Sequence, residues 1–223
     1  MYYVKELYTF FDELAAHNDR QWFADNRPRY EHLRALWLED IDRMLAHITV
    51  WQPDMAGQTA KSCAYRIYRD TRFSNDKTPY KTHFSASFSP WGRKTDHAGY
   101  YLEIGRARTY DQGLYGGLWC VESAMLKKLR HAIVDNIEEW EEIINAPDML
   151  RHFPGWCSST LKTIPKGWDR NHPQAEYLRM TNYGKFLPCT DSFYLDPSWP
   201  EKAAEMFHVL KPFVDFLNYS IDE

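Results

Sequence analysis

Residues Lys81–Ser89 read Lys-Thr-His-Phe-Ser-Ala-Ser-Phe-Ser, and their apolar and polar side chains alternate. The apolar set falls on one side of an extended chain and the polar set on the other, Phe84, Ala86 and Phe88 against His83, Ser85 and Ser87. This period of two predicts a β-strand with one face against a core. Residues Ala64–Asp70 and Gly99–Ile104 alternate in the same way. The connections between the three stretches are too short for crossover helices, so we expect adjacent antiparallel strands.

Apolar residues at helical spacing occupy the chain on both sides of these strands. Before the strands, one helical stripe runs from Leu7 to Leu14, and a long helix has Pro28 in its first turn. After the strands, the last helix begins at Ser198, which has the residue type of an N-cap. The order of helices, strands and helices predicts an α+β fold class. We expect a single domain over residues 1–223, in which N- and C-terminal helices pack on a mainly antiparallel sheet.

The composition is that of an ordinary globular protein, with 223 residues of which 44% are hydrophobic and 26% are charged. A chain of this size buries roughly 70% of the surface of its unfolded state, so it needs neither disulfides nor a structural metal to hold a core. Its uncharged runs are too short to span a bilayer, and its first residues lack the layout of a secretory signal. We therefore expect no membrane partner and a cytoplasmic localisation.

The cysteines lie at least 32 residues apart and form no Cys-x-x-Cys pair; they are Cys63, Cys120, Cys157 and Cys189. This spacing excludes zinc ribbons and thioredoxin-like redox motifs, so we expect free thiols in a reducing compartment. Histidine pairs at zinc-site spacing and glycine-rich nucleotide motifs are also missing from the sequence. The sequence therefore predicts no metal site and no cofactor.

Positive charge is concentrated in one stretch of an otherwise acidic chain. Residues 61–94 hold eight basic side chains and only two acidic ones, whereas the whole chain has a formal net charge of −4. Such a basic island indicates a local anion site, because a protein that binds long polyanions is normally basic throughout. The island favours a small or short anionic ligand over a long duplex.

The basic island contains the side chains that we expect to hold this ligand. Arginine binds phosphate or carboxylate through its planar guanidinium, lysine adds an adjustable charge, and hydroxyl groups donate further hydrogen bonds. The predicted ligand-binding residues are Arg66, Arg69, Arg72, Ser74, Lys77, Tyr80, Lys81 and, from a later irregular loop, Lys166. In the alternative interpretation, the arginines pair with Asp70, Asp76, Glu103 or carboxylates of the helices and only stabilise the fold.

The basic island also contains a long and specific motif. From Arg66 to Lys81 it reads Arg-Ile-Tyr-Arg-Asp-Thr-Arg-Phe-Ser-x-Asp-Lys-Thr-Pro-Tyr-Lys. The motif resembles the signature of domain of unknown function 2461, a family of conserved hypothetical proteins. The resemblance extends over nearly the whole chain and includes Asn18-Asp-Arg-x-Trp-Phe23, Gly116-Gly-Leu-Trp119 and His172-Pro173. It implies a protein of unknown function and carries over no catalytic residue.

Three interpretations of the island remain. In the first, the protein is a module that binds a phosphate-bearing or other anionic ligand, such as a nucleotide or a nucleic-acid end. In the second, it is an enzyme, a hydrolase or transferase, and Asp70 or His83 is the acid or base that acts on a phosphorylated substrate. In the third, it is a scaffold whose arginines form structural ion pairs. The sequence favours binding over catalysis, and catalysis over a scaffold.

Overall fold

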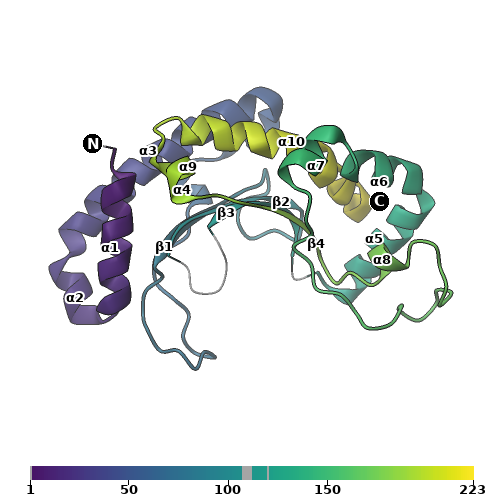
Figure 1. The fold of residues 1–223 in the computed structure, drawn as a ribbon, viewed down its shortest axis with the longest axis horizontal. Coiled ribbons are helices and arrows are strands. Elements are labelled where there is room, and N and C mark those ends of the chain that lie inside the picture. Colours follow the sequence, from purple (N-terminus) through teal and green to yellow (C-terminus); the bar gives the residue numbers. More distant parts are fainter. Residues whose placement is uncertain (1, 107–111, 120) are drawn as a thin grey trace. The chain divides into compact units, whose positions relative to one another are not determined.

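The computed structural model of the chain describes residues 2–106, 112–119 and 121–223 (Figure 1). The helices are α1 (Val4–Ala16), α2 (Arg20–Asp25), α3 (Arg27–Trp51), α4 (Ala60–Cys63), α5 (Ser123–Asp135), α6 (Ile137–Ile144), α7 (Pro147–His152), α8 (Ala175–Leu178), α9 (Asp191–Leu195) and α10 (Trp199–Asp222), with a 3-10 turn η1 (Pro53–Gly57). The strands are β1 (His83–Phe88), β2 (Gly99–Gly105), β3 (Gly113–Leu118) and β4 (Tyr183–Pro188). They form one antiparallel sheet in the order β1-β2-β3-β4, which confirms the predicted α+β fold class.

Residues at the helix starts explain where α2 and α3 begin. The carboxylate of Asp19 accepts hydrogen bonds from the backbone N–H groups of Gln21 and Trp22 at 2.8 and 2.9 Å, and α2 starts at the next residue. Pro28 lies in the first turn of α3, where its missing N–H leaves no bond unmade. The predicted start of the long helix is confirmed.

Residues Ala64–Asp70 do not form the strand that the alternation predicts. They make only isolated antiparallel bridges, Ala64 with Ala86 and Tyr68 with Tyr80. The two bridges are out of register, because they lie four positions apart on this segment and six positions apart on the facing one, so a continuous ladder cannot form between them. Beyond the Tyr68 bridge, Pro79 has no N–H to donate, but its carbonyl accepts a hydrogen bond from the Arg69 backbone N–H at 2.9 Å. The segment therefore runs beside β1 as an irregular edge.

By its internal contacts, the chain divides into two compact units. Unit 1 comprises Met1–Arg93, Tyr101–Leu114 and Pro188–Glu205, and unit 2 comprises Lys94–Tyr100, Tyr115–Leu187 and Met206–Glu223. Both units contribute residues to β2 and β3. The expectation of a single domain over residues 1–223 stays a prediction.

Each unit has its own aromatic core. In unit 1, the ring of Phe84 in β1 lies 5.1 Å from that of Phe11 in α1 and 4.9 Å from that of Trp37 in α3, measured between centroids. In unit 2, the fully buried Trp140 of α6 lies 5.6 Å from Phe213 of α10. The even-numbered residues of β1 thus face the helices of unit 1. Its odd-numbered residues are left for the opposite face of the strand.

Two further observations concern the thiols and the helices of the described residues. Cys63, Cys157 and Cys189 are unbridged, as the spacing predicts, and Cys120 lies outside the described residues. Within the described ranges, every helix is too short or too polar to traverse a lipid bilayer.

Candidate functional site

Six side chains of unit 1 gather on the face of β1 and β2 that points away from Phe84. We call this group the Tyr65 site, and its members are Tyr65, Lys81, His83, Arg93, Tyr101 and Glu103. The Lys81 Nζ and the Arg93 Cζ lie 5.3 and 5.4 Å from the centroid of the Tyr65 ring. The Tyr101 ring lies 6.1 Å from the same ring. Two cations and two phenol rings therefore meet at one place.

The strands and the edge segment position these side chains. His83 on β1 and Tyr101 and Glu103 on β2 occupy alternate positions, so they share the face opposite the apolar one. The backbone N–H of Tyr65 donates to the Ser85 carbonyl at 2.9 Å, which ties the edge segment to β1. The guanidinium of Arg93 donates to the Ala64 carbonyl next to Tyr65.

Glu103 is a buried acid, and only one of its two carboxylate oxygens accepts a hydrogen bond from the described residues. The residue is 5% exposed, and its Oε2 accepts a hydrogen bond from the Tyr101 hydroxyl at 2.7 Å. Its Oε1 is buried and has no hydrogen-bond partner among the described residues. Burial raises the pKa of Glu103, partly opposed by the Tyr101 hydrogen bond and the charge of Lys81. An unpaired buried oxygen of this kind calls for a donor that the described residues do not supply.

The pKa values of His83 and Lys81 are lowered, whereas that of Glu103 is raised. Burial, with a smaller effect of the Lys81 charge, lowers the pKa of His83 to about 3. The imidazole is therefore neutral at neutral pH, and its Nε2 lies 3.6 Å from Glu103 Oε2 without forming an ion pair. Burial also lowers the pKa of Lys81. Buried groups whose pKa values are shifted at one place are typical of binding and catalytic sites.

The cations around Tyr65 form no close ion pair with a carboxylate of the described residues, although the charge of Glu103 acts on Lys81 from a greater distance. In the part of the chain that the structure describes, no carboxylate oxygen lies within 4.0 Å of Arg66, Lys81 or Arg93. Arg66 is exposed on the edge segment, and its charge contributes to lowering the pKa of Lys81. Like charges that converge without a close ion-pair partner favour the binding of an anion.

Two of the predicted arginines are instead paired within their own loop. Arg69 Nη1 lies 2.8 Å from Asp76 Oδ2, and Arg72 Nη2 lies 2.6 Å from Asp70 Oδ2. The Arg72 side-chain hydrogen bond lowers the pKa of Asp70 to about 2, so that this exposed carboxylate has no role as an acid near neutral pH. These pairs are of the kind that the alternative, structural interpretation expects.

The other predicted residues are spread over several environments. The Lys77 Nζ donates to the Thr71 carbonyl at 2.9 Å, and the half-buried Ser74 follows in the same loop. Tyr80 is buried, with its ring stacked on that of Phe23 at 4.0 Å between centroids. Lys166 is an exposed residue of unit 2. Among the predicted residues, Lys81 and His83 lie in the Tyr65 site, and Arg66 is close enough to Lys81 to act on its charge.

The comparison with family models agrees with the motif. The model of the family described as conserved hypothetical protein (DUF2461) matches residues 6–216. The chain belongs to the DUF2461 family. Neither the curated proteins nor the solved structures contain a match to the chain. In this DUF2461 protein, the matched region includes every member of the Tyr65 site.

Sequence reasoning selected four members of the Tyr65 site neither as ligand-binding nor as catalytic residues: Tyr65, Arg93, Tyr101 and Glu103. One signal was available for Glu103, an acidic residue inside a predicted strand, which is an unusual place for a charge. Arg93 lies in the loop between β1 and β2, and nothing in its spacing indicates that its side chain contacts Tyr65. The described residues contain no group of three or more histidine, cysteine, aspartate or glutamate side chains suited to a metal ion.

Proposed function

We propose that this DUF2461 protein binds a small phosphate-bearing or other anionic ligand at the Tyr65 site. The observation that carries the proposal is the convergence of Lys81 and Arg93 on Tyr65, with Arg66 close by, without a carboxylate within ion-pair distance in the described chain. We also propose a reducing, cytoplasmic setting, which the free thiols support.

The unpaired Oε1 of Glu103 narrows the chemistry of the ligand. A fully ionised phosphate has only acceptor oxygens, and one of them would face Oε1, which is itself an acceptor. A ligand that carries a hydroxyl group would instead donate a hydrogen bond to Oε1. Hydrogen phosphate and phosphate monoesters combine anionic oxygens with a proton that they can donate. Because the pKa of Glu103 is raised, the side chain can also carry a proton and donate a hydrogen bond to an anionic oxygen of the ligand.

Inorganic phosphate is expected to raise the melting temperature of the wild-type protein. A ligand at 100 times its dissociation constant stabilises a fold by about 2.7 kcal/mol. For a chain of this size, that corresponds to roughly 5–10 °C in a thermal-shift titration. Lys81→Met keeps the aliphatic packing and removes the charge, so we expect this variant to lose most of the shift.

The matched control is Lys61→Met, an exposed lysine of the same basic island on α4, which should keep the full shift. If phosphate leaves the wild-type melting temperature unchanged over millimolar concentrations, the proposal is wrong. In that case the scaffold interpretation, with its arginine ion pairs, takes its place.

One observation favours an enzyme as the second candidate function. His83 and Glu103 lie 3.6 Å apart, are shielded from water and have pKa values shifted in opposite directions. The pair suits a hydrolase or transferase that acts on a phosphorylated substrate, with one group moving a proton at the scissile oxygen. Turnover of p-nitrophenyl phosphate that His83→Gln abolishes while phosphate binding persists would establish catalysis. Binding without turnover would leave a binding module.

A further inference from the structure

We propose that the ligand of the Tyr65 site is a small phosphorylated aldehyde, which Lys81 binds covalently as an imine. In this arrangement, Arg93 lies beside the phosphate, and Glu103 is the acid that releases water. The inference rests on the proposed function, because the phosphate of the aldehyde occupies the place of the anion. It adds the chemical class of the ligand and the residue that forms a bond with it.

Lys81 is placed as a nucleophile. Its backbone N–H donates to the Ile67 carbonyl at 2.8 Å, so the residue continues the line of β1 and shares the face of His83, two positions away. Its Nζ makes no hydrogen bond or ion pair with the described residues. Burial lowers the pKa of Lys81, opposed by the charge of Glu103 and aided by that of Arg66. A larger share of the amine is therefore unprotonated, which is the form that attacks a carbonyl carbon.

Glu103 is placed as the matching acid. Its charge and that of Lys81 each act on the pKa of the other, although no oxygen of Glu103 lies within 4.0 Å of the Lys81 Nζ. The two groups therefore meet without a close ion pair that would occupy both of them. Burial raises the pKa of Glu103, and the neutral His83 at 3.6 Å does not favour the ionised carboxylate as a charged histidine would. The carboxyl group can thus carry the proton that imine formation needs.

The reaction balances within the site. The unprotonated amine of Lys81 adds to the aldehyde carbon, and the proton that the nitrogen loses passes to the carbonyl oxygen, which gives a carbinolamine. Glu103 then donates its carboxylic proton to the carbinolamine hydroxyl. That oxygen leaves as water while the lone pair of the nitrogen forms the C=N bond. The products are a protonated imine on Lys81, a carboxylate on Glu103 and one water molecule, so no oxidant or reductant takes part.

The unpaired Oε1 of Glu103 favours an aldehyde over a simple phosphate ester. The carbinolamine has a hydroxyl group next to Lys81, and this hydroxyl is a donor for the buried oxygen. A phosphorylated alcohol would supply a donor as well, but it would make no use of the unprotonated amine. An aldehyde is the ligand that uses both groups.

Arg93 suits the phosphate end of the ligand. Its Nη1 donates to the Ala64 carbonyl, which holds the side chain in place, and the guanidinium of this exposed residue has further N–H groups that bind no other described residue. Such a planar fork of donors matches a phosphate. Because Lys81 and Arg93 both lie beside the Tyr65 ring, at 5.3 and 5.4 Å from its centroid, a short ligand is enough to reach from one to the other.

Lys185 on β4 offers a comparison within the same chain. Burial lowers its pKa to about 8, opposed by the charge of the exposed Glu176. The residue is 2% exposed, and its Nζ lies 3.8 Å from the centroid of the Trp156 ring, whereas Lys81 is half-buried. Lys185 therefore shows whether a lowered pKa alone is enough for the reaction, and we expect that it is not.

Reductive trapping with glyceraldehyde 3-phosphate tests the inference, because sodium cyanoborohydride converts an imine into a stable secondary amine. Peptide mapping by mass spectrometry then locates the adduct. We expect the adduct to form on Lys81 at least tenfold faster than on Lys185 or on the exposed Lys61. It should also form at least tenfold faster than with glyceraldehyde, which lacks the phosphate. Glycerol 3-phosphate lacks the carbonyl group, so it should form no adduct and should compete with trapping.

Three variants assign the roles. Lys81→Arg keeps the positive charge but has no nucleophilic amine, so it should lose the adduct and retain more of the thermal shift with inorganic phosphate than Lys81→Met. Glu103→Gln keeps the shape of the side chain but has no carboxylic proton to donate, so trapping should slow at least tenfold. Lys61→Met, on α4, should change neither measurement.

The outcomes separate the two proposals. A thermal shift with inorganic phosphate, together with trapping that is no faster on Lys81 than on Lys61 or no faster than with glyceraldehyde, overturns the imine inference and keeps the anion site. Absence of both the shift and the adduct in the wild type overturns the proposed function itself. Peptide mapping of the wild type decides the position of the adduct even if Lys81→Arg does not fold.

Discussion

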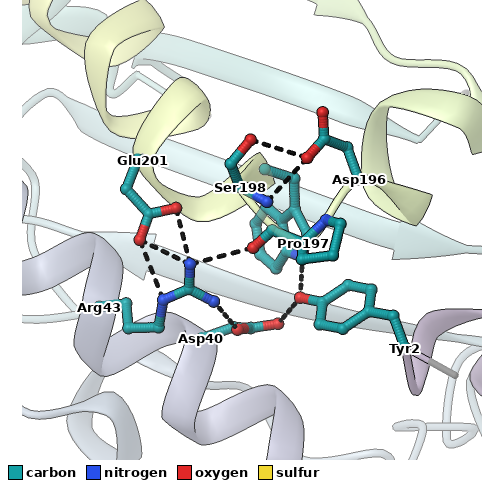
Figure 2. A network of polar contacts seen from close by, with 8 residues as sticks. Tyr2, Asp40, Arg43, Asp196, Pro197, Ser198 and Glu201 are labelled. Carbon is teal, nitrogen blue, oxygen red and sulfur yellow. Dashed lines mark hydrogen bonds and ion pairs between the residues drawn. The ribbon is translucent and has the colours of Figure 1, made fainter.

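Replacement of Asp40 with asparagine is expected to lower the free energy of unfolding by about 3 kcal/mol, because Asp40 is the buried centre of a polar network (Figure 2). The residue is 4% exposed and accepts hydrogen bonds from the Tyr2 hydroxyl and, at 2.8 Å, from Arg43 Nη1. The same Tyr2 oxygen accepts a hydrogen bond from Trp199 Nε1 at 2.8 Å. Arg43 continues the network to Glu201 on α10 at 2.8 Å. One carboxylate thus joins three segments of unit 1 that are distant in sequence.

Asparagine has the shape of aspartate but turns one acceptor into a donor. Its NH2 group would face either the Tyr2 hydroxyl or the Arg43 guanidinium, both of which donate to Asp40. We expect a fall in melting temperature of roughly 6–12 °C, measured by calorimetry or circular dichroism. Glu39→Gln, at the exposed neighbouring position on α3, is the matched control and should change the melting temperature little. Equal melting temperatures for the two variants would show that the network does not stabilise the fold.

The fold was predictable where a segment has two different faces. The alternation of β1 reflects a helix-covered side with Phe84 and an opposite side with His83, so it is visible in the sequence. The edge segment alternates as well, yet its two bridges to the facing segment are out of register, and the pattern of one segment cannot show the register of its pairing. β4 contains Gly184, where an added Cβ would lie 2.9 Å from the Trp119 ring. The need for glycine at this position comes from a residue that is distant in sequence, so the local pattern of β4 does not show it.

The candidate site was predictable to the extent that it depends on counting charges. The excess of basic residues in the island selected Arg66 and Lys81, and the polar side of β1 selected His83. Counting does not tell which cations are neutralised locally. Arg72 pairs with Asp70, two positions away, through side-chain geometry that spacing leaves open. Glu103 is recruited from the neighbouring strand, so its meeting with His83 depends on the register of the sheet.

Acid is expected to destabilise this protein strongly through His83. The folded-state pKa of about 3 lies below the ordinary histidine value of about 6.5, so the unfolded chain binds a proton on this residue more readily than the folded chain. The contribution to stability is complete above pH 6.5 and is lost as the pH falls toward 3. Each pH unit in this window costs about 1.4 kcal/mol, which amounts to about 3 kcal/mol between pH 6.5 and pH 4.

His83→Gln removes the titrating group and keeps a neutral polar side chain. In urea unfolding, this variant should therefore lose about 3 kcal/mol less of its free energy of unfolding than the wild type between pH 6.5 and pH 4. The raised pKa of Glu103 acts in the opposite sense, since the folded chain takes up that proton more readily as the pH falls. Glu103→Gln should accordingly make the acid sensitivity steeper. His47→Gln, at an exposed position on α3, should leave the wild-type slope unchanged. A wild-type stability that does not change between pH 6.5 and pH 4, or a slope that His83→Gln leaves intact, would show that His83 is not held neutral by burial.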